Sequence, residues 1–561
     1  MPVPTHTRFA VFARVGLLPV ALVLATVLGL GSYCEASDDT SLAWLFSGVL
    51  ARQPVPSVPL YFHGWGHLLA AAYTALPAVA WLGALLGGLL LVATMLAFAV
   101  LDKLLRPYLK PETLGLVLAM FFCVAWLEHW LWFSYVRVAL LLAGGALLYA
   151  AQRPGRVGPV AVGLAGLGAA WLMRPSLGVL AFGATLPAVL LLAGHWRRAL
   201  PLVAGATVVL LVATSISAWR HTPAEIRTQV RDARFARILD FEQVHPHPHT
   251  GADSLGTEAI SLWMLGDTSV INEALYRRAY AFDAADFWGR QVPEKLLLRC
   301  GLLVRDYFPV LLALLATAAI TSRGKGRKPF FWPVQLGFFA VITMFAGLLK
   351  LPPRLALPLL DFWLLTNLIF LLKAFQPPAK ARSSQAGAVS APLFSTAQLS
   401  RLAIAAAGIC VLLYGAKMLH RRQVLGQERG RHERALAEIS RRTAGGPRVL
   451  AGTNDLLKSL SPFRVYGVGA GPTLMLSGWP SHDASQAALR QHLSGTPDEA
   501  GCLRQLAARK DAVHWVLSAE TAHWLNRRFR FGAGAAPAVV LRPGAALAAD
   551  SSLRWYEPQM R

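Results

Sequence analysis

The sequence contains little charge for its length. Asp, Glu, Lys and Arg make up only 15% of the 561 residues, and 55% of the residues are hydrophobic. A soluble chain normally carries about 25% charge, so water alone is excluded as the solvent for this protein. Cysteine is scarce as well, and its spacing, without any CxxC pair, predicts neither a disulfide framework nor a zinc site. The five cysteines are Cys34, Cys123, Cys300, Cys410 and Cys502.

Acidic residues are outnumbered by basic ones. The 54 Lys and Arg against 30 Asp and Glu give a formal net charge of +24. A nucleic-acid-binding protein would gather these charges in one basic stripe. Here many of them form short clusters between apolar runs, which is typical of a membrane protein. We therefore expect membrane lipids, and no nucleic acid, as partners.

Long apolar runs predict a polytopic α-helical membrane protein with about eleven transmembrane helices. Each run is long enough, or nearly so, to cross a hydrocarbon core of about 30 Å. Cys34-Glu35-Ala36 loosely fits a signal cleavage site, but the first run spans the membrane by length, so we expect it to remain uncleaved. The runs lie near residues 9–31, 77–101, 112–133, 135–151, 157–173, 177–194, 199–218, 296–320, 330–349, 355–373 and 399–418.

The basic clusters predict the topology. With a cytoplasmic N-terminus, every short inner loop is basic, as the positive-inside rule requires. The transmembrane domain then covers residues 1–418, with outer loops at 32–76 and 219–295 and a cytoplasmic linker at 376–398. Residues 419–561 form an extracytoplasmic domain of a plasma (inner) membrane protein. Six basic residues directly after the last run oppose this assignment: Lys417, Arg421, Arg422, Arg429, Arg431 and Arg434.

The C-terminal segment alternates two kinds of pattern. Residues 464–468, 512–517 and 538–541 read as strands, whereas 484–493 and 499–510 read as helices. This alternation predicts a small soluble α/β domain. In the loop at 219–295, helical runs at 226–241 and 262–280 predict a folded segment over the outer face.

The first outer loop contains the most informative residues, the adjacent carboxylates Asp38 and Asp39. Apolar residues from Leu42 to Leu50 recur at helical spacing, and a second such stretch begins at Trp65. We expect two juxtamembrane helices, the first lying in the interface plane with the acidic pair at its start. Ser37 or Asp38 as an N-cap, with Asp39 favouring the helix dipole, is a structural alternative.

This arrangement resembles the GT-C superfamily of membrane glycosyltransferases: many spans, an acidic pair in the first outer loop, paired juxtamembrane helices, a large outer loop and a soluble C-terminal domain. Bacterial relatives of protein mannosyltransferases and the lipid A aminoarabinose transferases are similar. The resemblance implies transfer of a sugar from a polyprenyl-phosphate donor to an extracytoplasmic acceptor, which is an envelope glycan, a lipid or a protein.

The resemblance also implies roles for the acidic pair. Asp38 and Asp39 are the candidates for the base that takes the acceptor proton, with a pKa raised by partial burial, or for the ligands of a divalent cation, Mg²⁺ or Mn²⁺. Which carboxylate does which stays open.

Cations at the outer ends of spans are the candidates for binding the donor phosphate. They are Arg174, Lys350 and Arg354. Arginine binds phosphate oxygens with a planar fork. The alternative is that these side chains reach the lipid headgroups without a functional role.

Glu128 and His129 interrupt an apolar, Trp-rich span near its outer end. Ionisable groups at such a depth usually face a cavity or a partner, so both are cavity candidates, as is His63 in the first outer loop. The alternative is a shallow position that meets water among interfacial tryptophans.

Two other functions compete with the transferase. A transporter or flippase of a lipid-linked glycan would need charged residues along several spans, which this sequence mostly lacks. A non-catalytic envelope assembly protein would need only one anchoring helix rather than eleven.

Overall fold

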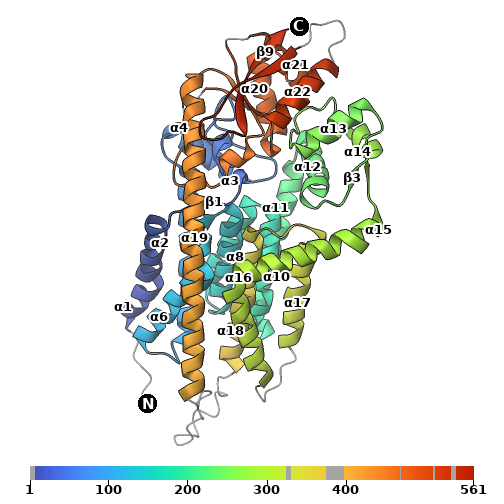
Figure 1. Ribbon diagram of the computed structural model, residues 1–561. Helices are drawn as coiled ribbons and strands as arrows, with labels where there is room; N and C mark the ends of the chain where they lie inside the picture. The colour runs from blue at the N-terminus through green and yellow to red at the C-terminus, as the bar shows by residue number, and fades with distance from the viewer. Residues whose placement is uncertain are drawn as a thin grey trace, which may run out of the picture.

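The protein is a bundle of long helices with a folded domain at one end (Figure 1). The computed structural model describes residues 7–323, 330–374, 397–509 and 512–560, apart from 468, 470 and 532–538. The predicted linker at 376–398 therefore lies outside the described residues, except for its last two positions, which begin a helix.

The predicted spans coincide with helices. Among the residues that the structure describes, eight helices are long and apolar enough to cross a membrane. Two shorter apolar helices are α8 (Tyr135–Ala151) and α9 (Val157–Met173), and the last run lies in the first half of α19 (Ala397–Thr443). The eight are α1–η1–α2 (Arg8–Gly29), α5 (Trp81–Leu105), α6–η2–α7 (Pro111–Leu131), α10 (Pro175–Ala193), α11 (Trp196–Arg220), α15–η4–α16 (Ala284–Arg323), α17 (Phe331–Leu348) and α18 (Pro353–Ala374).

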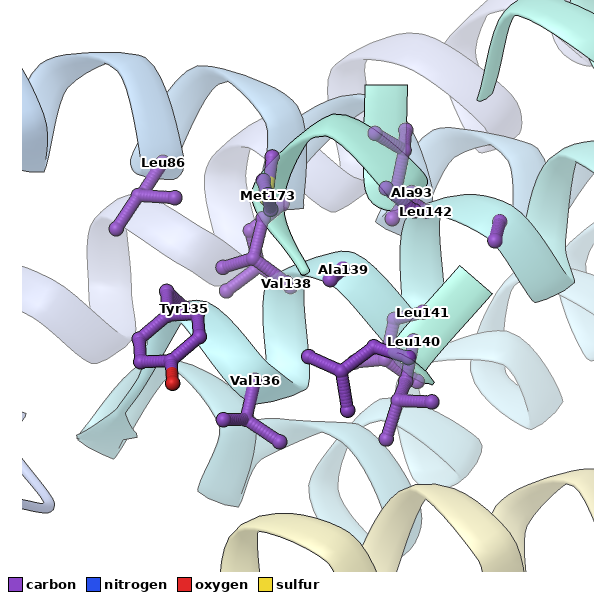
Figure 2. Close-up of a cluster of buried hydrophobic side chains, with 14 of the residues drawn as sticks. Leu86, Ala93, Tyr135, Val136, Val138, Ala139, Leu140, Leu141, Leu142 and Met173 are labelled. Carbon is purple, nitrogen blue, oxygen red and sulfur yellow. The ribbon is translucent and has the colours of Figure 1, made fainter. Parts of the chain in front are cut away.

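Helix α8 forms the centre of the bundle. All its residues except Tyr149 are buried, and Figure 2 shows its first two turns packed against Leu86 and Ala93 of α5 and Met173 of α9. Glycines allow α9 to approach it closely, because a Cβ at Gly166 would lie 2.5 Å from the Cβ of Ala146. This close packing fixes the position of α8 in the bundle.

Helix α16 (Val292–Arg323) bends at Tyr307, whose φ of −126° and ψ of 26° are not helical. Pro309 follows two residues later and cannot donate a backbone hydrogen bond. The first half of α16 therefore runs obliquely across the end of the bundle, next to α15 (Ala284–Asp286) and η4 (Phe287–Gln291) (Figure 1).

Basic residues of four connections gather at the end of the bundle opposite the folded domain. Lys103 Nζ donates to the carbonyl of Gln152 at 2.8 Å, and Lys373 Nζ donates to that of Leu191 at 2.6 Å. The ends of α5, α8, α10 and α18 are thus neighbours, as the predicted alternation of loops requires.

The first loop contains helices at both expected positions, α3 (Ser37–Phe46) and α4 (Trp65–Ala75). The expectation that the first of them lies in the interface plane is wrong, because α3 is buried on nearly all sides. The domain after α19 covers it: the Thr40 hydroxyl donates to the carbonyl of Leu457, in η6 (Asn454–Leu457), at 2.9 Å. The apolar stripe of α3 therefore faces protein.

The middle loop is folded throughout its described length. Thr222 and Glu225 form a capping box at the start of α12 (Pro223–Phe235). The predicted helix at 262–280 is largely wrong, because only its end is helical and a helix that was not predicted, α13 (Gly251–Ser261), precedes it. The other elements are η3 (Ala236–Asp240), β3 (His245–Pro246), α13 (Gly251–Ser261), α14 (Glu273–Ala279) and β4 (Tyr280–Ala281), with β3 and β4 antiparallel.

The C-terminal domain is a five-stranded mixed sheet with order β6-β5-β7-β9-β8. Strand β5 is parallel to β6 and β7, while β9 is antiparallel to β7 and β8. The predicted strand at 464–468 is wrong: residues 464–467 form an irregular connection. The strands are β5 (Arg448–Ala451), β6 (Thr473–Met475), β7 (His514–Ser518), β8 (Val539–Ala546) and β9 (Leu553–Met560), and the helices are η7 (Trp479–His482), α20 (Ala484–Ser494), α21 (Glu499–Ala508) and α22 (Ala519–Phe531).

The middle loop and the C-terminal domain share one hydrophobic core. Leu255 and Ile260 of the loop pack in the same cluster as Trp515 and Trp524 of the domain. The indole N–H of Trp524 donates to the carbonyl of Leu255 at 2.9 Å, and Arg528 pairs with Asp267 at 2.6 Å. These two segments, the middle loop and the C-terminal domain, therefore form a single unit over the bundle, which we call the soluble unit.

Helix α19 connects this unit to the bundle without a break. Its 47 residues extend about 70 Å at 1.5 Å per residue, and Figure 1 shows it running along the bundle and into the domain. The predicted division between residues 418 and 419 falls inside this helix.

Candidate active site

A short strand pairing brings the first loop to the centre of the bundle. Strand β1 (Tyr33–Cys34) runs parallel to β2 (Trp132–Phe133), which lies between α7 (Leu127–Leu131) and α8. The residues after β1 therefore lie at the N-terminal end of α8. The N-cap of α3 is Ala36, so neither Ser37 nor Asp38 is the N-cap, although Asp38 and Asp39 occupy the first turn.

Asp38 faces a basic side chain from the far end of the sequence. Its Oδ2 lies 3.4 Å from Nη2 of Arg354, and both side chains are partly exposed. Arg354 belongs to the first turn of α18, and its backbone N–H donates to Oε1 of Glu35 at 2.9 Å. Glu35 thus fixes the start of α18 next to Asp38.

Arg174 lies in the connection between α9 and α10. Pro175 follows it and disfavours helical geometry, which agrees with the extended φ of −162° and ψ of 115°. Its Nη1 donates to the hydroxyl of Tyr135 at 3.2 Å, and its guanidinium lies 5.2 Å from the ring centre of Tyr61. The guanidinium is thereby held at the end of the bundle that carries the soluble unit.

Lys350 precedes α18 and pairs with the middle loop. Its Nζ lies 2.6 Å from Oδ1 of Asp240, and both side chains are partly exposed. This pair connects the folded middle loop to the connection between α17 and α18, next to a hydrogen bond from Gln243 Nε2 to the carbonyl of Leu348 at 3.0 Å.

These residues line one cavity of about 860 Å³ between the bundle and the soluble unit. Its volume lies within the usual range for small-ligand sites, about 300 to 1,000 Å³. Asp38, Arg174, Lys350 and Arg354 all contribute to its wall, together with Tyr61 from the first loop and residues of the middle loop and the C-terminal domain. The structure therefore brings together four of the predicted site residues from three distant parts of the sequence.

Asp39 does not line this cavity. Its side chain is buried, and its Oδ1 accepts a hydrogen bond from the backbone N–H of Tyr135, the first residue of α8, at 2.9 Å. Its Oδ2 has no hydrogen-bond partner among the described residues. Burial raises the pKa of Asp39 to about 7, with further contributions from the charges of Asp38 and Glu35.

The arrangement of the acidic pair bears on the expected divalent cation. Asp38 faces Arg354 in the cavity, whereas Asp39 binds a backbone amide in the interior. In this arrangement the two carboxylates do not converge on one point. Within the described residues no group of three His, Cys, Asp or Glu side chains has the geometry of a metal site either. The pair therefore does not fit a shared cation.

Glu128 and His129 are buried behind the cavity and do not line it. Glu128 lies 3.0 Å from Arg421 of α19 and accepts a hydrogen bond from the Tyr414 hydroxyl at 2.8 Å. His129 Nε2 lies 2.8 Å from Asp361 of α18. Their exposures of 1% and 0% leave no contact with water. Both residues therefore face partners within the bundle.

His63 lies outside the cavity as well. Its ring centre is 5.8 Å from that of Trp171 and 6.5 Å from that of His221. Burial and the proximity of His221 lower the pKa of His63. The side chain thus belongs to the contact between the first loop and the start of the middle loop.

Two residues that connect these groups were not predicted from the sequence. Arg137 is fully buried in α8, lies 2.9 Å from Glu35, and contacts His129 Nδ1 at 3.2 Å. An arginine inside the apolar run at 135–151 is a signal that could have identified it. Glu35 had no comparable signal, because it lies in a loop after the first apolar run, where a carboxylate is ordinary.

Comparison with solved structures identifies the fold. The crystal structure of ArnT from Cupriavidus metallidurans bound to undecaprenyl phosphate matches this chain with a TM-score of 0.50 and 14% sequence identity. The match covers 97% of this chain and 98% of that one. The resemblance to the GT-C transferases predicted from the sequence is thereby confirmed at the level of the fold. No family model matches the sequence, and no curated protein does.

Proposed function

We propose that this protein is a glycosyltransferase that moves a sugar from a polyprenyl-phosphate donor to an acceptor at the cavity between the bundle and the soluble unit. The observation that carries the proposal is the placement of Asp38 beside Arg354, in a cavity that also contains Arg174 and Lys350. This reaction needs a carboxylate as the base and positive charge for the departing phosphate, and one cavity contains both. The acceptor is an envelope glycan, lipid or protein on the outer face of the plasma membrane.

In the proposed step, the Asp38 carboxylate accepts the proton of an acceptor hydroxyl. The acceptor oxygen forms a bond to the anomeric carbon of the donor sugar. The bond between that carbon and the phosphate oxygen breaks, and its electron pair leaves with the polyprenyl phosphate. Asp38 suits the role of base because it is partly exposed to the cavity and has no backbone amide as a fixed partner among the described residues.

Arg174 and Arg354 are the proposed phosphate ligands. A guanidinium can donate two parallel hydrogen bonds to phosphate oxygens and stabilise the charge that develops as the carrier leaves. Both stand at the ends of helices where a carrier phosphate anchored by its lipid tail would lie. Lys350 is engaged by Asp240, so we assign it the weaker role of a nearby positive charge.

The ArnT comparison supports the donor class, because the matched crystal structure contains undecaprenyl phosphate. A flippase is less well supported. The buried charges behind the cavity pair with one another, as Glu128 does with Arg421 and His129 with Asp361, and they provide no series of open polar groups along the described spans. An assembly protein without catalysis leaves the position of Asp38 in a cavity unexplained.

The test uses the purified full-length protein in lipid nanodiscs. Binding of undecaprenyl phosphate is measured first, and Arg174→Ala should weaken it. Labelled polyprenyl-phosphate sugars are then incubated with envelope extract, and label should move to an acceptor while undecaprenyl phosphate is released in equal amount. A flippase would move the label across the membrane still attached to its carrier. Binding unchanged in Arg174→Ala, together with no release of carrier from any donor, would contradict the proposal.

A further inference from the structure

Aromatic side chains from the loops and from the C-terminal domain line the cavity, and we call this part of its wall the roof. Tyr61 of the first loop and Trp479 of the C-terminal domain both line it, and their ring centres are 5.4 Å apart at an interplanar angle of 62°. Trp263 of the middle loop contributes to the same wall. Three segments far apart in the sequence thus each supply an aromatic side chain to one side of the cavity.

The position of Trp479 is fixed by contacts with the middle loop. Gly478, directly before it, has a φ of 85°, which favours glycine, and its N–H donates to the carbonyl of Trp263 at 2.8 Å. A Cβ at Gly478 would lie 2.9 Å from Oδ1 of Asn454. His482, at the end of the same turn, pairs with Asp232 at 2.6 Å. The indole is therefore held in place before any ligand arrives.

The aromatic pair lies directly next to the proposed phosphate site. The guanidinium of Arg174 is 5.2 Å from the ring centre of Tyr61, and the ring of Trp479 packs against the same tyrosine in an edge-on arrangement. In a polyprenyl-phosphate sugar, the sugar is joined to the phosphate through a single oxygen. A phosphate bound at Arg174 therefore places the attached sugar against Tyr61 and within reach of Trp479.

Polar groups around this pair complete the setting. Asp232 and Asn454 line the cavity near Trp479. The side-chain oxygen of Asn454 can accept a hydrogen bond from a hydroxyl. Oδ1 of Asp232 pairs with His482, while its Oδ2 is buried and has no hydrogen-bond partner among the described residues. An apolar ring face combined with a few acceptor groups suits a sugar, which has an apolar face of C–H groups and a rim of hydroxyls.

We propose that Tyr61 and Trp479 form the subsite for the transferred sugar, so that the C-terminal domain supplies a specificity-determining residue to a reaction centre in the bundle. The inference rests on the proposed function and goes further, because it assigns the sugar to the aromatic roof of the cavity and the phosphate to Arg174 and Arg354. In this proposal, the long helix α19 and the shared core hold Trp479 next to the cavity residues of the bundle.

The experiment compares two kinds of ligand on each variant. Affinity is measured for undecaprenyl phosphate and for its glucosyl, mannosyl and aminoarabinosyl esters, with full-length protein in nanodiscs. At least one ester should bind the wild type more tightly than the bare carrier. Trp479→Ala should weaken that ester about tenfold, which corresponds to ~1.4 kcal/mol, while the affinity for undecaprenyl phosphate stays unchanged. Arg174→Ala should weaken both ligands.

Two further variants separate stacking from folding. Trp479→Phe retains an aromatic ring and should keep most of the ester affinity, whereas Trp479→Leu retains apolar volume without a ring and should behave like the alanine variant. Trp288→Ala, at an exposed position of η4, is the matched control and should change neither affinity.

The outcomes distinguish this inference from the proposed function. If undecaprenyl phosphate binds equally to wild type and Arg174→Ala and no ester releases its carrier, the proposed function fails. If undecaprenyl phosphate binds at Arg174 but no ester binds more tightly, the sugar subsite is overturned. Equal loss of both ligands in Trp479→Leu, or full ester affinity in that variant, also overturns it.

Discussion

Asp38 and Asp39 are adjacent in the chain, yet their carboxylates lie in different environments: Asp38 is 3.4 Å from the guanidinium of Arg354 at the cavity, and Asp39 accepts the backbone N–H of Tyr135 in the interior at 2.9 Å. Successive residues of a helix point about 100° apart, so one turn of α3 serves two purposes. The two residues should therefore respond differently to the same substitution.

Asp38→Asn should abolish most of the activity. Asparagine keeps the size of the side chain but cannot accept the acceptor proton, so turnover should fall by about 10²- to 10⁴-fold while the protein still inserts and folds. Asp39→Asn keeps an oxygen that can accept the Tyr135 amide and should retain turnover near the wild-type value. Turnover is measured with a working donor on purified variants. Near wild-type turnover in Asp38→Asn would remove it as the base.

Asp39 should make stability depend on pH. Its pKa is raised from 3.8 to about 7 in the folded protein, so between these values the folded state keeps a proton that the unfolded state has lost. Stability should therefore fall as pH rises from about 4 to about 7 and then level off. Asp39→Asn mimics the protonated carboxyl and should remove this decrease, so that it is more stable than wild type at pH 8.

The measurement for Asp39 is the midpoint of thermal unfolding in detergent at pH 5 and pH 8. Asp38→Asn serves as the comparison: it removes one charge that raises the pKa of Asp39 but leaves burial, the main cause, so it should reduce the difference between the two pH values only in part. An identical pH dependence in wild type and Asp39→Asn would show that the proton on Asp39 is not involved.

The sequence predicted the spans well because a run of apolar residues is a local property. Arg174, Lys350 and Arg354 could be singled out for the same reason, since each stands at the end of an apolar run. Their convergence on Asp38 could not be predicted, because Asp38 and Arg354 are separated by 316 positions and no local pattern records such a contact.

Other features were inaccessible to the sequence for physical reasons. The stripe of α3 indicates an apolar face but not whether lipid or protein covers it. Trp479 has no distinguishing neighbours in the sequence, and its role depends on the packing of η7 against the middle loop. The buried pair of His129 and Asp361 joins two spans, so that no local pattern records its contact, although each residue by itself is an ionisable group inside an apolar run.

Arg174 should bind phosphate rather than only reach the headgroups. Arg174→Ala should weaken undecaprenyl phosphate binding by about 10- to 100-fold, as expected for loss of hydrogen bonds to a charged group worth ~1.5–3 kcal/mol, and Arg174→Lys should lose less. Tyr135→Phe removes the hydroxyl that accepts from Arg174 and should cause a smaller loss through orientation alone. Equal affinity in all four proteins would return Arg174 to a headgroup-reaching role.

The orientation in the membrane can be tested with fusions. The basic connections at one end of the bundle should be cytoplasmic, so alkaline phosphatase fused after Arg561 should be active. Phosphatase fused after Gly194, in the connection between α10 and α11, should be inactive although expressed. The reverse pattern would place the cavity on the cytoplasmic side and exclude an extracytoplasmic acceptor.

The basic residues after the last span seemed to oppose this orientation, and the structure shows why the first of them need not. Arg421 does not lie free near the headgroups: it is 3.0 Å from the buried Glu128 and within cation–π distance of Trp132, at 4.5 Å. Lys417 likewise pairs with Asp306. These charges are neutralised inside the protein, so they carry little weight in setting the topology.

The pair of Glu128 and Arg421 should therefore be a stability element that joins α19 to the bundle. Arg421→Ala leaves a buried carboxylate short of one cation and should cost about 3–5 kcal/mol, whereas the exposed neighbour Arg422→Ala should change stability little. Glu128→Gln alone should also destabilise, because it leaves Arg421 and Arg137 without a full countercharge. If the two residues interact directly, the double variant Glu128→Gln/Arg421→Ala should lose clearly less than the sum of the single losses. The midpoint of thermal unfolding, followed by loss of the monodisperse peak on size exclusion, is measured for the wild type and the four variants. Strictly additive losses would mean that the two charges act independently and that α19 is held by its other contacts.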